Sequence, residues 1–135
     1  MTEQLLKELE SLLGTDDFEY DSEEIMEKLE DEGAGMDAVE ALLAMMERHP
    51  ADDFGMPGAV VHFIERSYPD YVPMLAASVE RAPALQTVWM LNRIINGSDE
   101  KEKYLAILKN VSENASAEAA VRKLAADFLE FQAGR

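Results

Sequence analysis

Apolar residues recur along the whole chain with the spacing of a helix face. Near the start, leucines stand three and four residues apart, from Leu5 to Leu13, as expected for one side of a helix. The same spacing returns in seven further segments, the last of which ends near Phe131. No segment shows the sustained alternation of apolar and polar residues that predicts a strand. The pattern therefore predicts an all-α protein with about eight helices.

Glycine, proline or a capping residue separates the helical segments. Gly14 is expected to end the first helix, and Asp21 or Ser22 to cap the second, which ends at the glycines of 33–35. The later helices are expected over about 36–48, 57–67, 70–81, 85–96, 98–113 and 117–131.

The short connections predict that neighbouring helices form antiparallel hairpins. From residue 36 onward the helices group as 36–67, 70–96 and 98–132, which are similar in length. Pairs of this length are typical of a HEAT-like or armadillo-like stack. The three pairs share no consensus residues, so an irregular helical bundle fits the pattern as well. A chain of 135 residues is expected to form a single domain, 1–135.

The charge is strongly uneven. The chain has 28 Asp and Glu against 12 Lys and Arg, a net charge of −16, and residues 1–55 hold 18 of the acids with only three bases. We expect an acidic N-terminal part, 1–55, on a near-neutral helical body, 56–135. Such a charge argues against nucleic acid and anionic membrane surfaces as partners, because both would repel it. The apolar fraction of 47% argues against disorder of the whole chain.

The chain contains no cysteine, which excludes disulfides and thiolate chemistry. Residues 1–13 are acidic and amphipathic, unlike a signal peptide, and no apolar run approaches the roughly 20 residues of a membrane span. We therefore expect a cytoplasmic protein.

Candidate catalytic and metal sites are weak. His62 and Glu65 share a helix face, but a zinc-hydrolase helix needs a second histidine four residues away and a third ligand. A calcium loop aligned on Asp17 fails at Ser22 and Lys28, where glycine and glutamate are required. Phosphate-binding glycine loops are absent from the sequence. We expect no catalytic residues, no cofactor and no metal, hence a protein that is not an enzyme.

The segment 16–32 has ten acids in 17 residues, with two aromatic residues among them. A solvated helix face would explain part of this charge. The acids start before the expected helix, however, and aromatic residues among charges are typical of interface hot spots. An acidic surface of this kind suits a basic protein partner. The predicted contact residues are Asp16, Asp17, Phe18, Glu19, Tyr20, Asp21, Glu23, Glu24 and Glu27.

The later part of the chain resembles the small all-helical immunity proteins of bacterial polymorphic-toxin and contact-dependent growth inhibition systems. The resemblance lies in the segments 57–65, 68–71, 87–96 and 121–131, and Trp-Met-Leu-Asn-Arg, 89–93, is its most specific part. It implies a cytoplasmic, non-catalytic protein, monomeric before it binds one cognate toxin domain, often a nuclease, whose active site or substrate groove it occludes.

Within this resemblance, Trp89, Asn92 and Asn96 look structural, and the two asparagines are expected to bond backbone groups at neighbouring turns. The alternative function is a helical-repeat scaffold that grips a peptide or helix in a concave groove.

Overall fold

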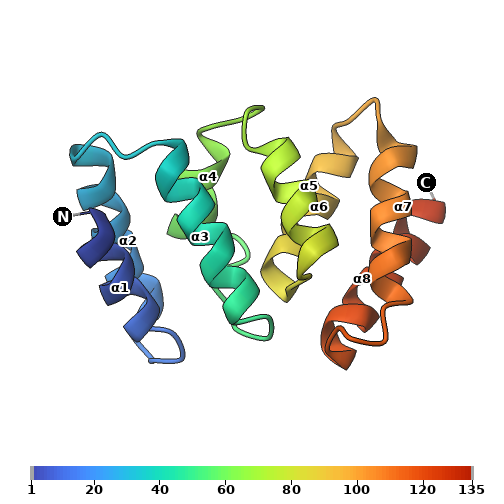
Figure 1. Ribbon diagram of the computed structural model, residues 1–135, viewed down its shortest axis with the longest axis horizontal. Coiled ribbons are helices and arrows are strands. Elements are labelled where there is room, and N and C mark those ends of the chain that lie inside the picture. Colours follow the sequence, from blue (N-terminus) through green and yellow to red (C-terminus); the bar gives the residue numbers. More distant parts are fainter. Residues whose placement is uncertain (1, 135) are drawn as a thin grey trace.

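The computed structural model describes residues 2–134, which form eight α-helices and no strand (Figure 1). This confirms the all-α prediction. The helices are α1 (Thr2–Ser11), α2 (Phe18–Asp31), α3 (Met36–Arg48), α4 (Ala59–Glu65), α5 (Val72–Arg81), α6 (Leu85–Asn96), α7 (Lys101–Ser112) and α8 (Ala119–Ala133).

The helices form a row of four antiparallel hairpins in two layers (Figure 1). The odd-numbered helices pack in order, α1 on α3, α3 on α5 and α5 on α7, while α2 packs on α4 and α6 on α8. This is the stacked arrangement rather than an irregular bundle, and the hairpin α1–α2 is its first member. The even layer is interrupted between α4 and α6, because α4 has only seven residues.

A 33-residue period underlies the stack. Four leucines, each fully buried, occupy equivalent positions on the odd-numbered helices: Leu9, Leu42, Leu75 and Leu108. Neighbouring positions share the period but vary in residue type, as in the series Leu5, Ala38, Tyr71 and Tyr104. Each hairpin therefore carries one buried leucine at an equivalent position, and the sequence analysis did not identify this 33-residue repeat.

Several expected helix starts are wrong: α5, α7 and α8 begin two or three residues later than expected, and α2 and α4 differ as follows. Helix α2 begins at Phe18, not at Asp21 or Ser22, and the hydroxyl of the buried Ser22 donates to the Glu19 carbonyl inside the helix. The helix starts a turn earlier because Phe18 joins Ser22 and the core residues behind it on one buried face. Helix α4 begins at Ala59, and Pro57 lies in the preceding turn, after a cis peptide bond.

Carboxylate–arginine pairs connect consecutive hairpins in both layers. Each joins a glutamate to an arginine of the next hairpin. The pairs are Glu10–Arg48 and Glu47–Arg81 in the odd layer, and Glu30–Arg66 and Glu65–Arg93 in the even layer. Two Glu-Arg dipeptides, 47–48 and 65–66, take part, and in each the arginine points back along the stack while the glutamate points forward. Part of the acidic charge of 1–55 is therefore structural.

We call these four Glu–Arg pairs the ladder, and substitution of Glu47 tests its contribution to stability. Arg81 binds its carboxylate through two nitrogens at 2.6 and 3.1 Å, and the fully buried Ser78 hydroxyl donates to it at 2.7 Å. Glu47→Ala is expected to cost about 1–2 kcal/mol of unfolding free energy, mostly because the Ser78 hydroxyl loses its acceptor; Arg81 is too exposed to add much. The control Glu40→Ala, on the exposed side of the same helix, should cost less than about 0.5 kcal/mol.

The pH dependence of the stability difference between wild type and Glu47→Ala provides a second test. Burial raises the pKa of Glu47, but hydrogen bonds from Arg81 and Ser78 outweigh it and hold the pKa below its ordinary value. A lowered folded-state pKa stabilises the fold at neutral pH, and this contribution is lost as the pH falls through that pKa. The difference between wild type and Glu47→Ala, measured by urea unfolding, should therefore be full at pH 7 and shrink in acid. A constant difference would contradict an ionised Glu47.

Candidate functional site

The solvent face of α2 is acidic and carries one large exposed aromatic ring. Tyr20 is 74% exposed, and Glu23, Glu24 and Glu27 follow it at the i+3, i+4 and i+7 positions, so all four share one face. The opposite face of the helix is buried. We call Tyr20, Glu23, Glu24 and Glu27 the acidic face of α2.

Most of the predicted contact residues lie on or beside this face, with one correction. Phe18 is only 8% exposed and packs edge-to-face against Phe54, with ring centroids 6.2 Å apart. It belongs to the core and cannot serve as an exposed anchor. Asp16 and Asp17 are exposed ahead of the helix, and Glu19 is exposed in its first turn. Asp21, also in the first turn, is half-buried. Acids in a first turn are favoured by the helix dipole, which explains part of this charge without a partner.

Intramolecular partners neutralise little of the acidic face. Lys28 lies 3.6 Å from Glu24 in an exposed pair one turn away. Within residues 2–134, Glu23 and Glu27 take part in no ion pair with a lysine, arginine or histidine. Unpaired carboxylates around an exposed tyrosine leave this face free to attract a basic surface.

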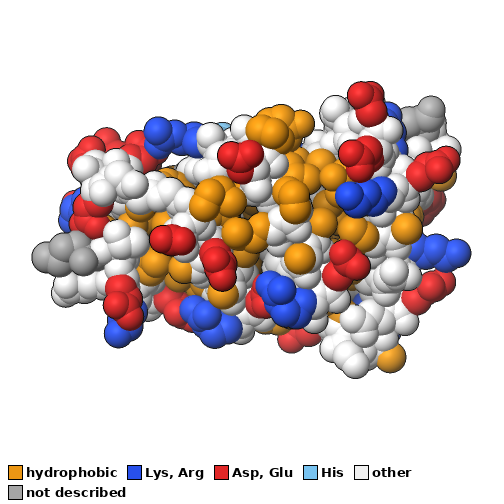
Figure 2. Space-filling view, turned by 45° about the horizontal axis from the view of Figure 1, so that its top comes forward, with side chains coloured by type: hydrophobic (Ala, Val, Ile, Leu, Met, Phe, Trp, Pro, Cys, Tyr) orange, Lys and Arg blue, Asp and Glu red, His pale blue; other side chains and the backbone are white. Residues whose placement is uncertain are grey.

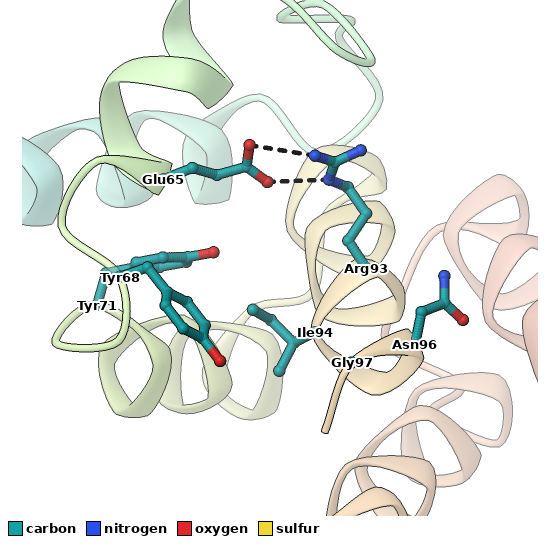
Figure 3. Close-up of a pocket in the computed structure, with 7 residues that line it drawn as sticks. All are labelled: Glu65, Tyr68, Tyr71, Arg93, Ile94, Asn96 and Gly97. Atoms are coloured by element: carbon teal, nitrogen blue, oxygen red, sulfur yellow. Dashed lines mark hydrogen bonds and ion pairs between the residues drawn. The ribbon is translucent and has the colours of Figure 1, made fainter. Parts of the chain in front are cut away.

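A second feature is a pocket of about 480 Å³ at the interruption of the even layer (Figure 3). It is lined by Glu65, Tyr68, Tyr71, Arg93, Ile94, Asn96 and Gly97. Arg93 donates two hydrogen bonds to Glu65, at 2.9 and 3.2 Å, so the ladder pair forms one rim. The Arg93 guanidinium also lies 5.0 Å from the centre of the Trp89 ring. Trp89 is half-buried and packs against the core, and its ring also supports this arginine.

Two tyrosines form the wall opposite α6 (Figure 3). Tyr68 is 61% exposed, whereas Tyr71 is 2% exposed, and their rings meet edge-to-face at 6.2 Å. Burial, with a smaller contribution from the Glu65 charge, raises the pKa of Tyr71 to about 12. Its hydroxyl is therefore protonated at physiological pH and can both donate and accept a hydrogen bond.

Sequence reasoning did not identify this pocket. Tyr68, Tyr71 and Arg93 fell within segments that carry the family resemblance, but no spacing rule joins residues of α4, the following loop and α6. The 33-residue period pairs Tyr71 with Tyr104 and was the available signal. The expected role of Asn92 and Asn96 is also wrong, since both accept hydrogen bonds from the Gln132 side chain of α8, at 2.9 and 2.8 Å, rather than from backbone groups.

The histidines lie in salt-bridged surroundings. His62 is 65% exposed with Nδ1 3.9 Å from Glu65, whose carboxylate Arg93 already holds. His49 follows α3 and lies between Glu10, at 2.7 Å, and Asp52, at 3.1 Å. Among the described residues 2–134, no group of three or more His, Cys, Asp and Glu side chains could hold a metal ion.

The outer surface of the layer formed by α1, α3, α5 and α7 is more apolar than the acidic face of α2. Figure 2 looks onto this layer and its upper loop edge, where apolar side chains gather along the middle and charged side chains surround them. Its partly or fully exposed apolar residues include Ala44, Pro73, Met74 and Ala77. No helix within residues 2–134 has the length and apolar character needed to cross a membrane.

Comparison with known proteins adds no identity: the sequence matches no family model and no curated protein, and the fold matches no solved structure.

Proposed function

We propose that this chain is an immunity protein, not an enzyme, that binds one cognate bacterial toxin domain in the cytoplasm and neutralises it. The toxin is a basic protein, a nuclease in our proposal, and the chain covers its active site or substrate groove. The resemblance of segments such as 87–96 supports this class of function. The observation that carries it is the acidic face of α2, where Tyr20 is 74% exposed among carboxylates.

The proposed mechanism follows from charge. A nuclease attracts phosphates with a basic groove, so a surface of carboxylates competes for the same residues. The net charge of −16 steers the encounter, and Tyr20 supplies a rigid ring of the type found at interface hot spots. No group on the chain has to react, because occlusion alone removes the toxin's activity.

The test is co-expression with a candidate cognate nuclease toxin domain, scored by cell survival, followed by affinity measurements at several salt concentrations. Glu23, Glu24 and Glu27 are reversed together to lysine. We expect affinity to fall about tenfold to a hundredfold at low salt, with a shallower salt dependence, because these charges speed association.

A matched control reverses Glu102, Glu113 and Glu130, which are exposed on α7, α8 and their connection, and makes the same change in net charge. It should retain most of the affinity. Equal losses in both variants would contradict a role for the acidic face of α2, and failure of the wild-type chain to protect cells from the toxin would contradict the immunity function.

A specific observation supports a second candidate, the helical-repeat scaffold that grips a peptide or helix. The pocket between α4 and α6 lies at a break in the even layer and exposes Tyr68. For such a scaffold, reversal of Glu23, Glu24 and Glu27 should leave partner affinity unchanged, whereas changes at the pocket should reduce it.

A further inference from the structure

The pocket between α4 and α6 contains a polar group without an internal partner. Tyr71 is 98% buried, and among the described residues its hydroxyl makes no hydrogen bond. No side-chain nitrogen or oxygen in that part of the chain is both sealed from solvent and unpaired. The hydroxyl must therefore open into the pocket, and Figure 3 shows it directed there. A buried ring that presents only its hydroxyl to a cavity is suited to bonding a ligand.

The surrounding walls fix the shape of that ligand. The largely exposed ring of Tyr68 offers a flat aromatic face on one side, and Ile94 lies across from it on α6 (Figure 3). The Glu65–Arg93 pair forms the polar rim. The space therefore fits a flat group on an aliphatic stem, with hydrogen-bonding capacity at its tip.

The electrostatics favour a cation. Glu65 and Arg93 neutralise each other, and the carboxyl end of α6, at Asn96 and Gly97, adds a partial negative charge to the pocket lining. The chain already holds one guanidinium over an aromatic ring at this site, since Arg93 lies over Trp89.

We propose that this pocket receives an arginine side chain of the protein partner. The guanidinium stacks on Tyr68 and donates hydrogen bonds to the Tyr71 hydroxyl oxygen and to the second lone pairs of the Glu65 carboxylate. The assignment rests on the proposed function, because it supposes a basic protein partner, and it adds a specific anchor away from the acidic face of α2.

The pocket can be tested without the toxin. The isotope-labelled full chain is titrated with N-acetyl-arginine amide, and with the citrulline analogue as a neutral probe of the same shape. We expect saturable shifts of the Gly97 amide and the Trp89 indole signals with the arginine probe, at millimolar affinity, and much weaker ones with citrulline.

Tyr71→Phe removes only the unpaired hydroxyl, so the melting temperature should not change. The arginine probe should bind about threefold to tenfold more weakly to this variant. Tyr104→Phe is the matched control, because Tyr104 occupies the equivalent position one repeat later and is 7% exposed. It should leave probe affinity unchanged.

Three results would overturn the proposal: equal binding of the citrulline probe, unchanged affinity in Tyr71→Phe, or shifts confined to α2. The variant reversed at Glu23, Glu24 and Glu27 separates this inference from the proposed function. Retained probe binding in that variant supports the pocket even if the toxin experiment fails, and its loss shows that the probe reports only on the general acidic charge.

Discussion

Phe54→Ala is expected to lower the free energy of unfolding by about 3–5 kcal/mol, the loss typical of a large aromatic ring removed from a packed core. Phe54 belongs to the segment 51–55, which its composition predicts to be a polar loop. Its ring is instead 1% exposed and packs edge-to-face on Phe18, at the start of α2. Removing it would leave a cavity between the first and second hairpins.

Urea or thermal unfolding measures this loss. Tyr20→Ala is the control, because it also deletes an aromatic ring but one that is 74% exposed, and it should cost less than about 0.5 kcal/mol. A double-mutant cycle with Phe18→Ala should give a coupling of about 0.5–1.5 kcal/mol beyond the buried area. A loss below about 1 kcal/mol for Phe54→Ala would show that the loop is not part of the core.

Gln86→Leu is expected to cost about 2–4 kcal/mol, because it leaves two loop backbone groups without partners. Gln86 lies fully buried on α6. Its Oε1 accepts a hydrogen bond from the Phe54 amide at 3.0 Å, and its Nε2 donates one to the Gly55 carbonyl at 2.6 Å. The leucine side chain preserves most of the volume, so the loss reports on hydrogen bonding rather than on a cavity.

Hydrogen exchange gives this prediction a local measurement. The Phe54 amide should lose its protection in Gln86→Leu by more than global destabilisation accounts for. Gln132→Leu serves as control, since Gln132 is only half-buried and bonds the side chains Asn92 and Asn96; it should cost about 1 kcal/mol and leave Phe54 protected. Unchanged protection of Phe54 in Gln86→Leu would mean that the loop does not depend on α6.

The backbone conformation of this loop is tightly constrained at Gly55. Gly55 has φ +99°, and a Cβ there would meet the Gly58 backbone at 2.9 Å, so only glycine fits this turn. The turn at Gly55 places the Phe54 ring in the core, where it packs against Phe18. Phe18 is the first residue of α2, so this contact positions the first turn of the helix. The orientation of the acidic face of α2 therefore depends on a loop that lies beyond α3 in the sequence.

Helix limits were predictable where breakers stand on both sides. The expected helices 36–48 and 85–96 agree with α3 and α6 at both ends, since glycine or proline lies close to each limit. The start of α2 was not predictable, because it depends on the contact between Phe18 and Phe54. The 33-residue repeat was visible in principle, in the spacing of Leu9, Leu42, Leu75 and Leu108, but single leucines are too common for that spacing to stand out.

The sequence by itself determined the helical class, most hairpin limits and the concentration of acids in residues 1–55. Periodicity, capping and chain breakers act over a few residues, so they can be read directly from the order of the chain. Only the tertiary structure decided which carboxylates brace the stack, that Phe18 is buried while Tyr20 is exposed, and that two tyrosines and Arg93 share a pocket. Each of these outcomes depends on contacts between residues that are far apart in the sequence. The Glu–Arg pairs of the stack, for example, join residues 28 to 38 positions apart in the chain, and only tertiary packing brings such residues together.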